Sequence, residues 1–223
     1  MRLVDRFTPG YRWQLRLTRG MQVGMVALFV VGVLEGRTGI IVNTAVAFGV
    51  SLLPAYLERD YDFPLNAGLT LWLTAAVFLH TLGTVGVPFA PENFYSTLPW
   101  WDKVTHTLSS SVVAAAGYTT ARAFDEHADS VRLPSQFMFV FILIITLAFG
   151  VFWEVIEFVI GEAASLTGSD AVLAQYGLTD TMLDLVFDTI GAVAVAVWGT
   201  AHLTDVVGAV TERLGERSQG SGR

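Results

Sequence analysis

The sequence contains no cysteine and only one lysine, Lys103, among its 223 residues. The absence of cysteine excludes disulfide bonds, thiolate nucleophiles, iron–sulfur ligation and cysteine-bound zinc. Charged residues are also scarce, at 15% of the chain, whereas a soluble domain carries about 25%. Any metal site in this chain would therefore use oxygen and imidazole ligands.

Familiar catalytic and nucleic-acid-binding patterns are also missing. The chain has no HExxH pair, no Walker-type glycine loop, no nucleophile elbow and no histidine–arginine signature of lipid phosphatases. Its formal net charge is -7, and it has no basic patch. This charge balance excludes nucleic acid as an expected partner.

Long apolar stretches are abundant, and 53% of the residues are hydrophobic. Six stretches approach or reach the roughly 20 residues that a spanning helix needs. They are Leu17–Leu34, Ile40–Leu57, Ala67–Val87, Lys103–Ala121, Pro134–Gly161 and Thr181–Leu203. We therefore expect an all-α polytopic membrane protein with about six transmembrane helices, in contact with the lipid bilayer of the plasma membrane.

The arginines predict the orientation of these spans. They gather before the first span, in the second and fourth loops, and after the last span, at Arg2, Arg6, Arg12, Arg16, Arg19, Arg59, Arg122, Arg132, Arg213, Arg217 and Arg223. The positive-inside rule places these segments in the cytoplasm, so both termini are expected there. We expect a basic interfacial segment over residues 1–16, a transmembrane domain over 17–203 and a flexible tail over 204–223.

With this topology, the ionisable residues of four spans fall in the outer half of the membrane. They are His80, Asp102, His106, Glu154, Glu157, Asp180, Asp184 and Asp188. Spacings of three or four residues place neighbours on one helical face, because an α-helix has 3.6 residues per turn. Because helix directions alternate, chance placement would scatter these residues over both leaflets, so we predict a single site.

The energy of burial indicates what this site holds. A carboxylate at the centre of a membrane span costs roughly 2.5–3.5 kcal/mol, so Glu154, Glu157, Asp184 and Asp188 together could cost on the order of 10 kcal/mol if unpaired. Shared protons, water or a bound cation must offset this cost. Carboxylate and imidazole ligands suit a divalent metal such as Mg²⁺, Mn²⁺ or Zn²⁺. The predicted metal ligands are Asp102, His106, Glu154, Asp184 and Asp188, with His80 and Asp180 as possible additional members.

Several of these residues also have simpler structural interpretations. Asp102 is a good helix N-cap and could pair with Lys103, and Asp180 could cap the last span. His106 could be a buried histidine that is hydrogen-bonded to a neighbouring helix. Small residues such as Ser109–Ser111 more often permit close helix packing than act as nucleophiles. The run Asp125–Asp129 looks like a metal site in isolation, but we expect a solvated cytoplasmic connector.

Three runs resemble known membrane protein families. They are Trp101-Asp102-Lys103-Val104-Thr105-His106, Trp153-Glu154-Val155-Ile156-Glu157, and Asp180–Asp184 continued to Asp188-Thr189-Ile190-Gly191-Ala192. They look like the YjdF-like family of inner-membrane proteins. More distantly, they are similar to VanZ-like proteins. VanZ-like proteins tend to have Asn before the final Gly, and this chain has no Asn there. The resemblance covers roughly Trp100 to Gly191. It implies a multi-span membrane protein, with a glycopeptide-resistance association for the VanZ relatives, and implies no settled reaction.

The sequence supports three functions for the cluster. The first is a metal-dependent membrane hydrolase or phosphoryl-type transferase acting on a lipid-linked or cell-envelope substrate, with Glu157 and His106 as catalytic residues. The second is a cation- or proton-coupled transport protein. A transport pathway needs polar residues on the cytoplasmic side, where Asn43, Gln136 and His202 are the main ones. The third is a non-catalytic membrane scaffold, and the sequence sets no oligomeric state.

Overall fold

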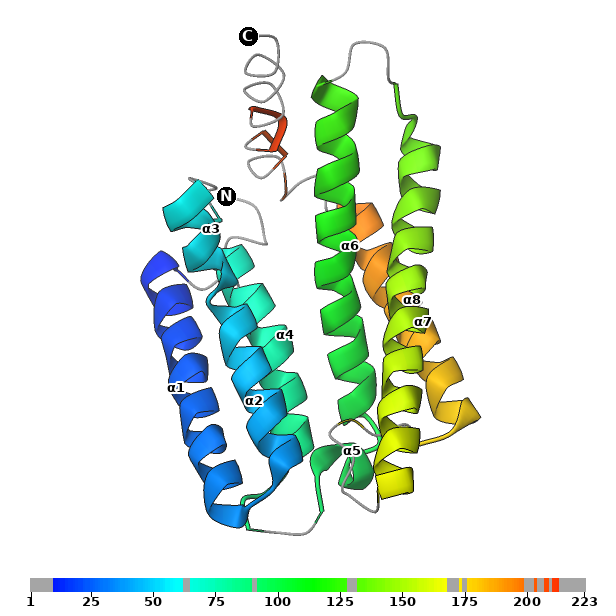
Figure 1. The fold of residues 1–223 in the computed structure, drawn as a ribbon. Helices are drawn as coiled ribbons and strands as arrows, with labels where there is room; N and C mark the ends of the chain where they lie inside the picture. The colour runs from blue at the N-terminus through cyan, green and yellow to red at the C-terminus, as the bar shows by residue number, and fades with distance from the viewer. Residues whose placement is uncertain are drawn as a thin grey trace, which may run out of the picture. The chain divides into compact units, whose positions relative to one another are not determined.

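The computed structural model describes residues 10–61, 65–89, 92–127, 132–167, 173, 176–198, 203, 207–208 and 210–212. All regular secondary structure in these residues is helical, with no strand. The helices are α1 (Tyr11–Glu35), α2 (Thr38–Ser51), α3 (Leu53–Tyr61), α4 (Ala67–Val85), α5 (Phe94–Thr97), α6 (Trp101–His127), α7 (Ser135–Thr167) and α8 (Leu178–Trp198). The chain divides into two compact units, residues 1–97 and 98–223, and Figure 1 shows the helices of each.

In the first unit, α1, α2 and α4 pack against one another. Leu28, Ile40 and Val85 form the centre of this packing, one from each helix. Gly32 permits the close approach of α1 and α2, because a Cβ atom at this position would lie 2.7 Å from the Cγ2 atom of Ile40. Gly36, with φ of 68°, ends α1 in the left-handed region and starts the short turn into α2.

The second expected span is divided into two helices near a proline. α2 ends at Ser51, and α3 begins at Leu53, just before Pro54. Proline has no N–H to donate, and its ring clashes with the preceding helical turn. The backbone continues through Leu52, whose carbonyl accepts a hydrogen bond from the Tyr56 N–H at 3.0 Å.

In the second unit, α6, α7 and α8 each pack against the other two. Gly191 of α8 lies against α6, where an added Cβ would clash with the Ser110 side chain and lie 3.0 Å from the Ser111 backbone nitrogen. The Thr107 hydroxyl of α6 donates to the Phe187 carbonyl of α8 at 3.3 Å. These contacts bring the backbones of α6 and α8 close together, as small residues do between membrane helices.

The expected membrane architecture is confirmed at the level of fold class. Five helical segments in the described residues are long and apolar enough to cross a membrane, namely Tyr11–Glu35, Thr38–Asp60, Ala67–Val85, Ser135–Leu166 and Leu178–Trp198. The remaining expected span corresponds to α6, which has 27 residues but many serines, threonines and small side chains. These polar residues fit the place of α6 against both α7 and α8. The orientation of the helices in the membrane stays a prediction.

The helix ends differ from the expected boundaries. α1 begins at Tyr11, so part of the predicted interfacial lead-in is helical, and α7 continues to Thr167. The predicted basic segment before residue 10 lies outside the described residues, as do Asp129 and His202. Within the predicted tail 204–223, residues 207, 208 and 210–212 are helical, and the rest also lies outside the described residues.

Candidate functional site

Helix α6 supplies Asp102 and His106 to the cluster. α6 begins at Trp101, so Asp102 lies in its first turn, where the helix dipole favours a negative charge. The Nε2 atom of His106, one turn later, lies 3.6 Å from the Asp102 Oδ1 atom. The structure shows no ion pair between Asp102 and Lys103; the Lys103 ammonium donates to the Pro99 carbonyl at 2.6 Å.

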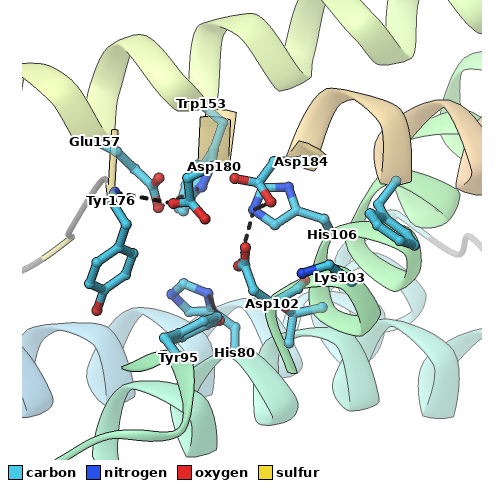
Figure 2. Close-up of polar contacts among 12 residues, drawn as sticks. His80, Tyr95, Asp102, Lys103, His106, Trp153, Glu157, Tyr176, Asp180 and Asp184 are labelled. Atoms are coloured by element: carbon cyan, nitrogen blue, oxygen red, sulfur yellow. Dashed lines mark hydrogen bonds and ion pairs between the residues drawn. The ribbon is translucent and has the colours of Figure 1, made fainter. Parts of the chain in front are cut away.

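Helix α8 supplies two buried carboxylates, Asp184 and Asp188, which are 2% and 4% exposed. They approach opposite nitrogens of the same imidazole. His106 Nε2 lies 3.9 Å from Asp184 Oδ1, and His106 Nδ1 is hydrogen-bonded with Asp188 Oδ1 at 3.2 Å. Figure 2 shows the side chains of Asp102, His106 and Asp184 pointing toward one another.

Asp102, His106 and Asp184 form a three-residue group whose ligand-type atoms are close enough together to hold a metal ion. One ligand-type atom from each residue lies within 4.8 Å of the other two. The Asp184 Oδ1 atom is buried and has no hydrogen-bond partner in the described part of the chain. The Asp102 and Asp184 carboxyl groups are also hydrogen-bonded to each other. Two carboxyl groups this close need a shared proton or a cation between them.

Helix α7 brings Glu154 and Glu157 to the same region. Glu154 is 5% exposed, and Glu157 interacts electrostatically with Glu154, His106 and Asp102. The indole N–H of Trp153 donates to Glu157 Oε1 at 3.0 Å, which holds this carboxylate in one orientation. Glu154, an expected ligand, is not a member of the three-residue group, and neither is Asp188.

Gly150 allows α7 to approach Asp188. A Cβ atom at Gly150 would clash with the Asp188 carboxylate and lie 3.2 Å from the Leu185 side chain. Gly150 precedes Glu154 by four residues, so both lie on the same face of α7. Because Gly150 carries no side chain, α7 can lie directly against the Asp188 carboxylate that contacts His106.

Asp180 secures the start of α8. Its Oδ2 atom accepts a hydrogen bond from the Tyr176 backbone N–H at 3.1 Å, and Figure 2 shows this contact. Asp180 is the third residue of α8, and an acidic residue there stabilises the helix start. Asp180 also interacts electrostatically with Asp102, His106 and Lys103.

His80 belongs to the first unit and contacts residues of that unit through both ring nitrogens. Its Nδ1 atom lies 2.9 Å from the Tyr95 hydroxyl of α5, and its Nε2 atom lies 3.4 Å from the Asn43 Oδ1 atom of α2. His80 therefore links three helices of the first unit.

Other polar residues singled out in the sequence have structural contacts. The Ser110 and Ser111 hydroxyls donate to carbonyls of their own helix, those of Thr107 at 3.1 Å and Leu108 at 2.6 Å. Asp125 forms an ion pair with Arg122 and accepts a hydrogen bond from the Leu133 backbone N–H at 2.7 Å. Asp125 therefore links the last turns of α6 to Leu133, two residues before α7 begins.

Sequence reasoning missed Trp153 and Gly150. The spacing of four residues between Trp153 and Glu157 could have indicated their hydrogen bond, because such pairs share a helical face. Gly150 also shares a face with Glu154. A glycine in a membrane helix next to buried carboxylates is a sign of close helix approach.

Comparison with known proteins places this set of helices in a family. A family described as predicted membrane protein (DUF2238) matches residues 17–205. This chain belongs to the DUF2238 family. The match covers all the described site residues, four of the five apolar spans in full and the first span from residue 17 onward, so this DUF2238 chain is a multi-pass membrane protein.

A curated relative shares part of this chain. It is an uncharacterized protein of Thermotoga maritima, 32% identical over 130 residues, which are 56% of this chain and 58% of the relative. The DUF2238 chain thus spans less than two thirds of that protein's length. No solved structure matches this DUF2238 chain.

Proposed function

We propose that this protein is a membrane-embedded, metal-dependent hydrolase or phosphoryl-type transferase that acts on a lipid-linked or cell-envelope substrate. The observation that carries the proposal is the group of Asp102, His106 and Asp184, whose ligand-type atoms lie within 4.8 Å of one another. The predicted orientation puts this group near the outer face of the plasma membrane. The YjdF-like resemblance agrees with the DUF2238 match, while the VanZ resemblance carries no part of the proposal.

The donor set fits a divalent cation. Asp184 Oδ1 is buried without a hydrogen-bond partner in the described residues, so a cation would supply the close polar contact that this oxygen lacks. Two carboxylates and one imidazole suit Zn²⁺ or Mn²⁺, and Mg²⁺ less well, because imidazole is a softer ligand than oxygen. Three protein ligands leave coordination positions open, as in catalytic metal sites.

Asp188 has a different role in this proposal from the one that the sequence predicted. The Asp188 Oδ1 atom lies 3.2 Å from the Nδ1 atom of His106. Asp102 and Asp184 lie on the other side of the ring, at the Nε2 atom. A carboxylate that accepts a hydrogen bond from Nδ1–H leaves the Nε2 lone pair for the cation and holds the ring in position. We therefore assign Asp188 as a positioning residue and Asp102, His106 and Asp184 as the ligands.

Glu157 is the proposed general base. When bound, the cation would polarise the scissile group and orient water. The Glu157 carboxylate would accept a proton from water while the water oxygen bonds to phosphorus or to the acyl carbon. The bond to the leaving oxygen breaks, and that oxygen takes the proton back from Glu157. The Trp153 hydrogen bond to Oε1 leaves Oε2 to accept this proton.

The distribution of polar residues supports a one-sided site over a transport pathway. Asn43, expected on the cytoplasmic side, lies near the start of α2, which the arginine pattern places at the outer side. There it donates to the Gly39 carbonyl at 3.0 Å and contacts His80 of the same unit. Gln136, the second residue of α7, is exposed. His202 lies outside the described residues. Gln136 precedes Glu154 by 18 residues on α7, about 27 Å of helix rise, so it does not extend the carboxylate cluster.

Metal content is the first test. The full chain is purified in detergent, and bound metals are measured by elemental mass spectrometry in the wild type and in the Glu154→Gln/Asp184→Asn double variant. About one metal per chain in the wild type and none in the variant supports the site. No metal in either protein, even after incubation with Mn²⁺ and Zn²⁺, overturns the metal-dependent proposal and favours transport or helix packing.

Hydrolysis is the second test, with Glu157→Gln as the variant. We expect loss of hydrolysis with metal still bound, because the amide cannot accept the proton of water. Glu162→Gln is the matched control, since Glu162 is exposed on the same helix. Unchanged hydrolysis in Glu157→Gln would remove Glu157 from the mechanism. Cation flux in proteoliposomes that disappears in Asp184→Asn would instead favour transport.

A further inference from the structure

Lys103 lies beside the carboxylate cluster without forming an ion pair. It follows Asp102 directly and precedes His106 by three residues on α6. Its ammonium donates to the Pro99 carbonyl and lies 6.0 Å from the centre of the Phe187 ring. Among the described residues it forms no ion pair with any carboxylate, although it interacts electrostatically with Asp180. Figure 2 shows Lys103 next to Asp102.

These contacts hold a positive charge in place and leave part of it available. An ammonium group has three N–H donors, and the Pro99 carbonyl accepts from one of them. The Phe187 ring attracts the charge without neutralising it. In a region rich in carboxylates, a lysine that forms no ion pair with them in the described residues is suited to an anion that arrives with the substrate.

We propose that Lys103 binds a phosphate oxygen of the substrate, so that the substrate class is a phosphoester. This inference rests on the proposed function, because the cation at Asp102, His106 and Asp184 would hold another oxygen of the same phosphate. Lysine binds phosphate as a point charge. A neutral carboxylic ester or amide would give this charge nothing to bind.

The aromatic residues next to Lys103 favour a lipid as the source of the phosphate. Trp100 and Trp101 form a tilted pair with ring centres 5.5 Å apart, and Trp100 is 54% exposed. Tryptophans of this kind mark the headgroup level of a membrane. Lys103 lies two residues after Trp101 on α6, which is about 3 Å of helix rise. A lipid phosphate at the headgroup level would therefore be at the height of the Lys103 side chain.

The experiment compares the full-length wild type with K103M and K103R in detergent, each loaded with Mn²⁺. Isothermal titration calorimetry measures the binding of Mn²⁺ and then of dihexanoyl phosphatidate, inorganic phosphate and uncharged dihexanoylglycerol. We expect K103M to bind Mn²⁺ like the wild type and phosphatidate about tenfold more weakly, the size of one charge-assisted hydrogen bond. K103R keeps the charge and should retain most of the affinity. Tighter binding of phosphatidate than of inorganic phosphate identifies the lipid as the source, and equal binding identifies free phosphate.

Two outcomes separate this inference from the function on which it rests. Equal phosphatidate affinity in wild type and K103M, with Mn²⁺ bound in both, overturns the role of Lys103 and leaves the metal site in place. The same conclusion follows if the Mn²⁺-loaded wild type binds no phosphate compound. Failure of the wild type to bind Mn²⁺ overturns the proposed function together with this inference.

Discussion

The two aspartates of α8, Asp184 and Asp188, lie at opposite ring nitrogens of His106 and have different surroundings. Asp184 Oδ1 has no hydrogen-bond partner in the described residues, whereas Asp188 Oδ1 is hydrogen-bonded to the Nδ1 atom. A residue that orients a ligand and a residue that is a ligand respond differently to substitution. Amide variants of the two aspartates therefore separate their roles.

We predict that Asp188→Asn weakens Mn²⁺ binding about 10–100-fold, the usual effect of losing a carboxylate behind a metal-bound histidine. Asp184→Asn should lower the affinity further, because it removes a ligand oxygen with its charge. Calorimetric titration of the purified variants measures both effects, with Glu162→Gln as the control. Equal losses in Asp188→Asn and Asp184→Asn would make Asp188 a ligand, and unchanged affinity in Asp188→Asn would exclude the positioning role.

At the scale of helices, the site depends on how closely α7 and α8 approach. Gly150 lies directly against the Asp188 carboxylate and the Leu185 side chain. Gly161, on the same helix, has no atom within 4 Å of the position where a Cβ would stand. The same substitution at these two glycines therefore separates the packing effect from the general effect of adding a methyl group to a helix.

We predict that Gly150→Ala destabilises the protein by about 1–3 kcal/mol, the usual effect of adding a methyl group to a tightly packed position. Gly161→Ala should be neutral or stabilising by up to about 1 kcal/mol, since alanine favours helix more than glycine does. Thermal unfolding in detergent measures both. Equal melting temperatures for the two variants would contradict the close contact at Gly150.

Gly150→Ala should also weaken metal binding, because the new methyl group displaces the carboxylate that orients His106. Calorimetry on the folded variant at low temperature tests this effect apart from stability. Wild-type Mn²⁺ affinity in Gly150→Ala would show that the position of Asp188 does not depend on the glycine.

At the scale of the whole molecule, the orientation of the helices decides which side of the membrane the site faces. The arginines predict cytoplasmic termini and an outward-facing cluster. Because the chain has no cysteine, single cysteines can be introduced without removing any native one. Ser96 and Ser135 are both exposed. Ser96 lies in the short helix α5, and Ser135 is the first residue of α7. The predicted topology places them on opposite sides of the membrane.

We predict that Ser96→Cys in intact cells reacts with a membrane-impermeant maleimide and that Ser135→Cys reacts only after the membrane is opened. The reason is that a charged maleimide cannot cross the bilayer. The extent of labelling is read from the mass of the purified chain. The reverse pattern would place the carboxylate cluster toward the cytoplasm and contradict an envelope substrate.

The sequence alone determined the protein class and most of the helices. The apolar stretches predicted a polytopic helical membrane protein because spans must be long and apolar, and the DUF2238 match agrees. The spacing of Asp102 and His106 predicted their contact, since residues four apart share a helical face. The break before Pro54 was not predicted, although proline explains it.

Only the tertiary structure decided which residues of different helices meet. Contacts such as His106 with Asp184 and Asp188 depend on the rotation and depth of one helix against another, which the spacing within a single helix does not set. Gly150 and Gly191 determine this approach because they let backbones and carboxylates come within reach. The tertiary structure also decided the contacts of His80 with Asn43 and Tyr95 in the first unit, because they join helices that are distant in the sequence.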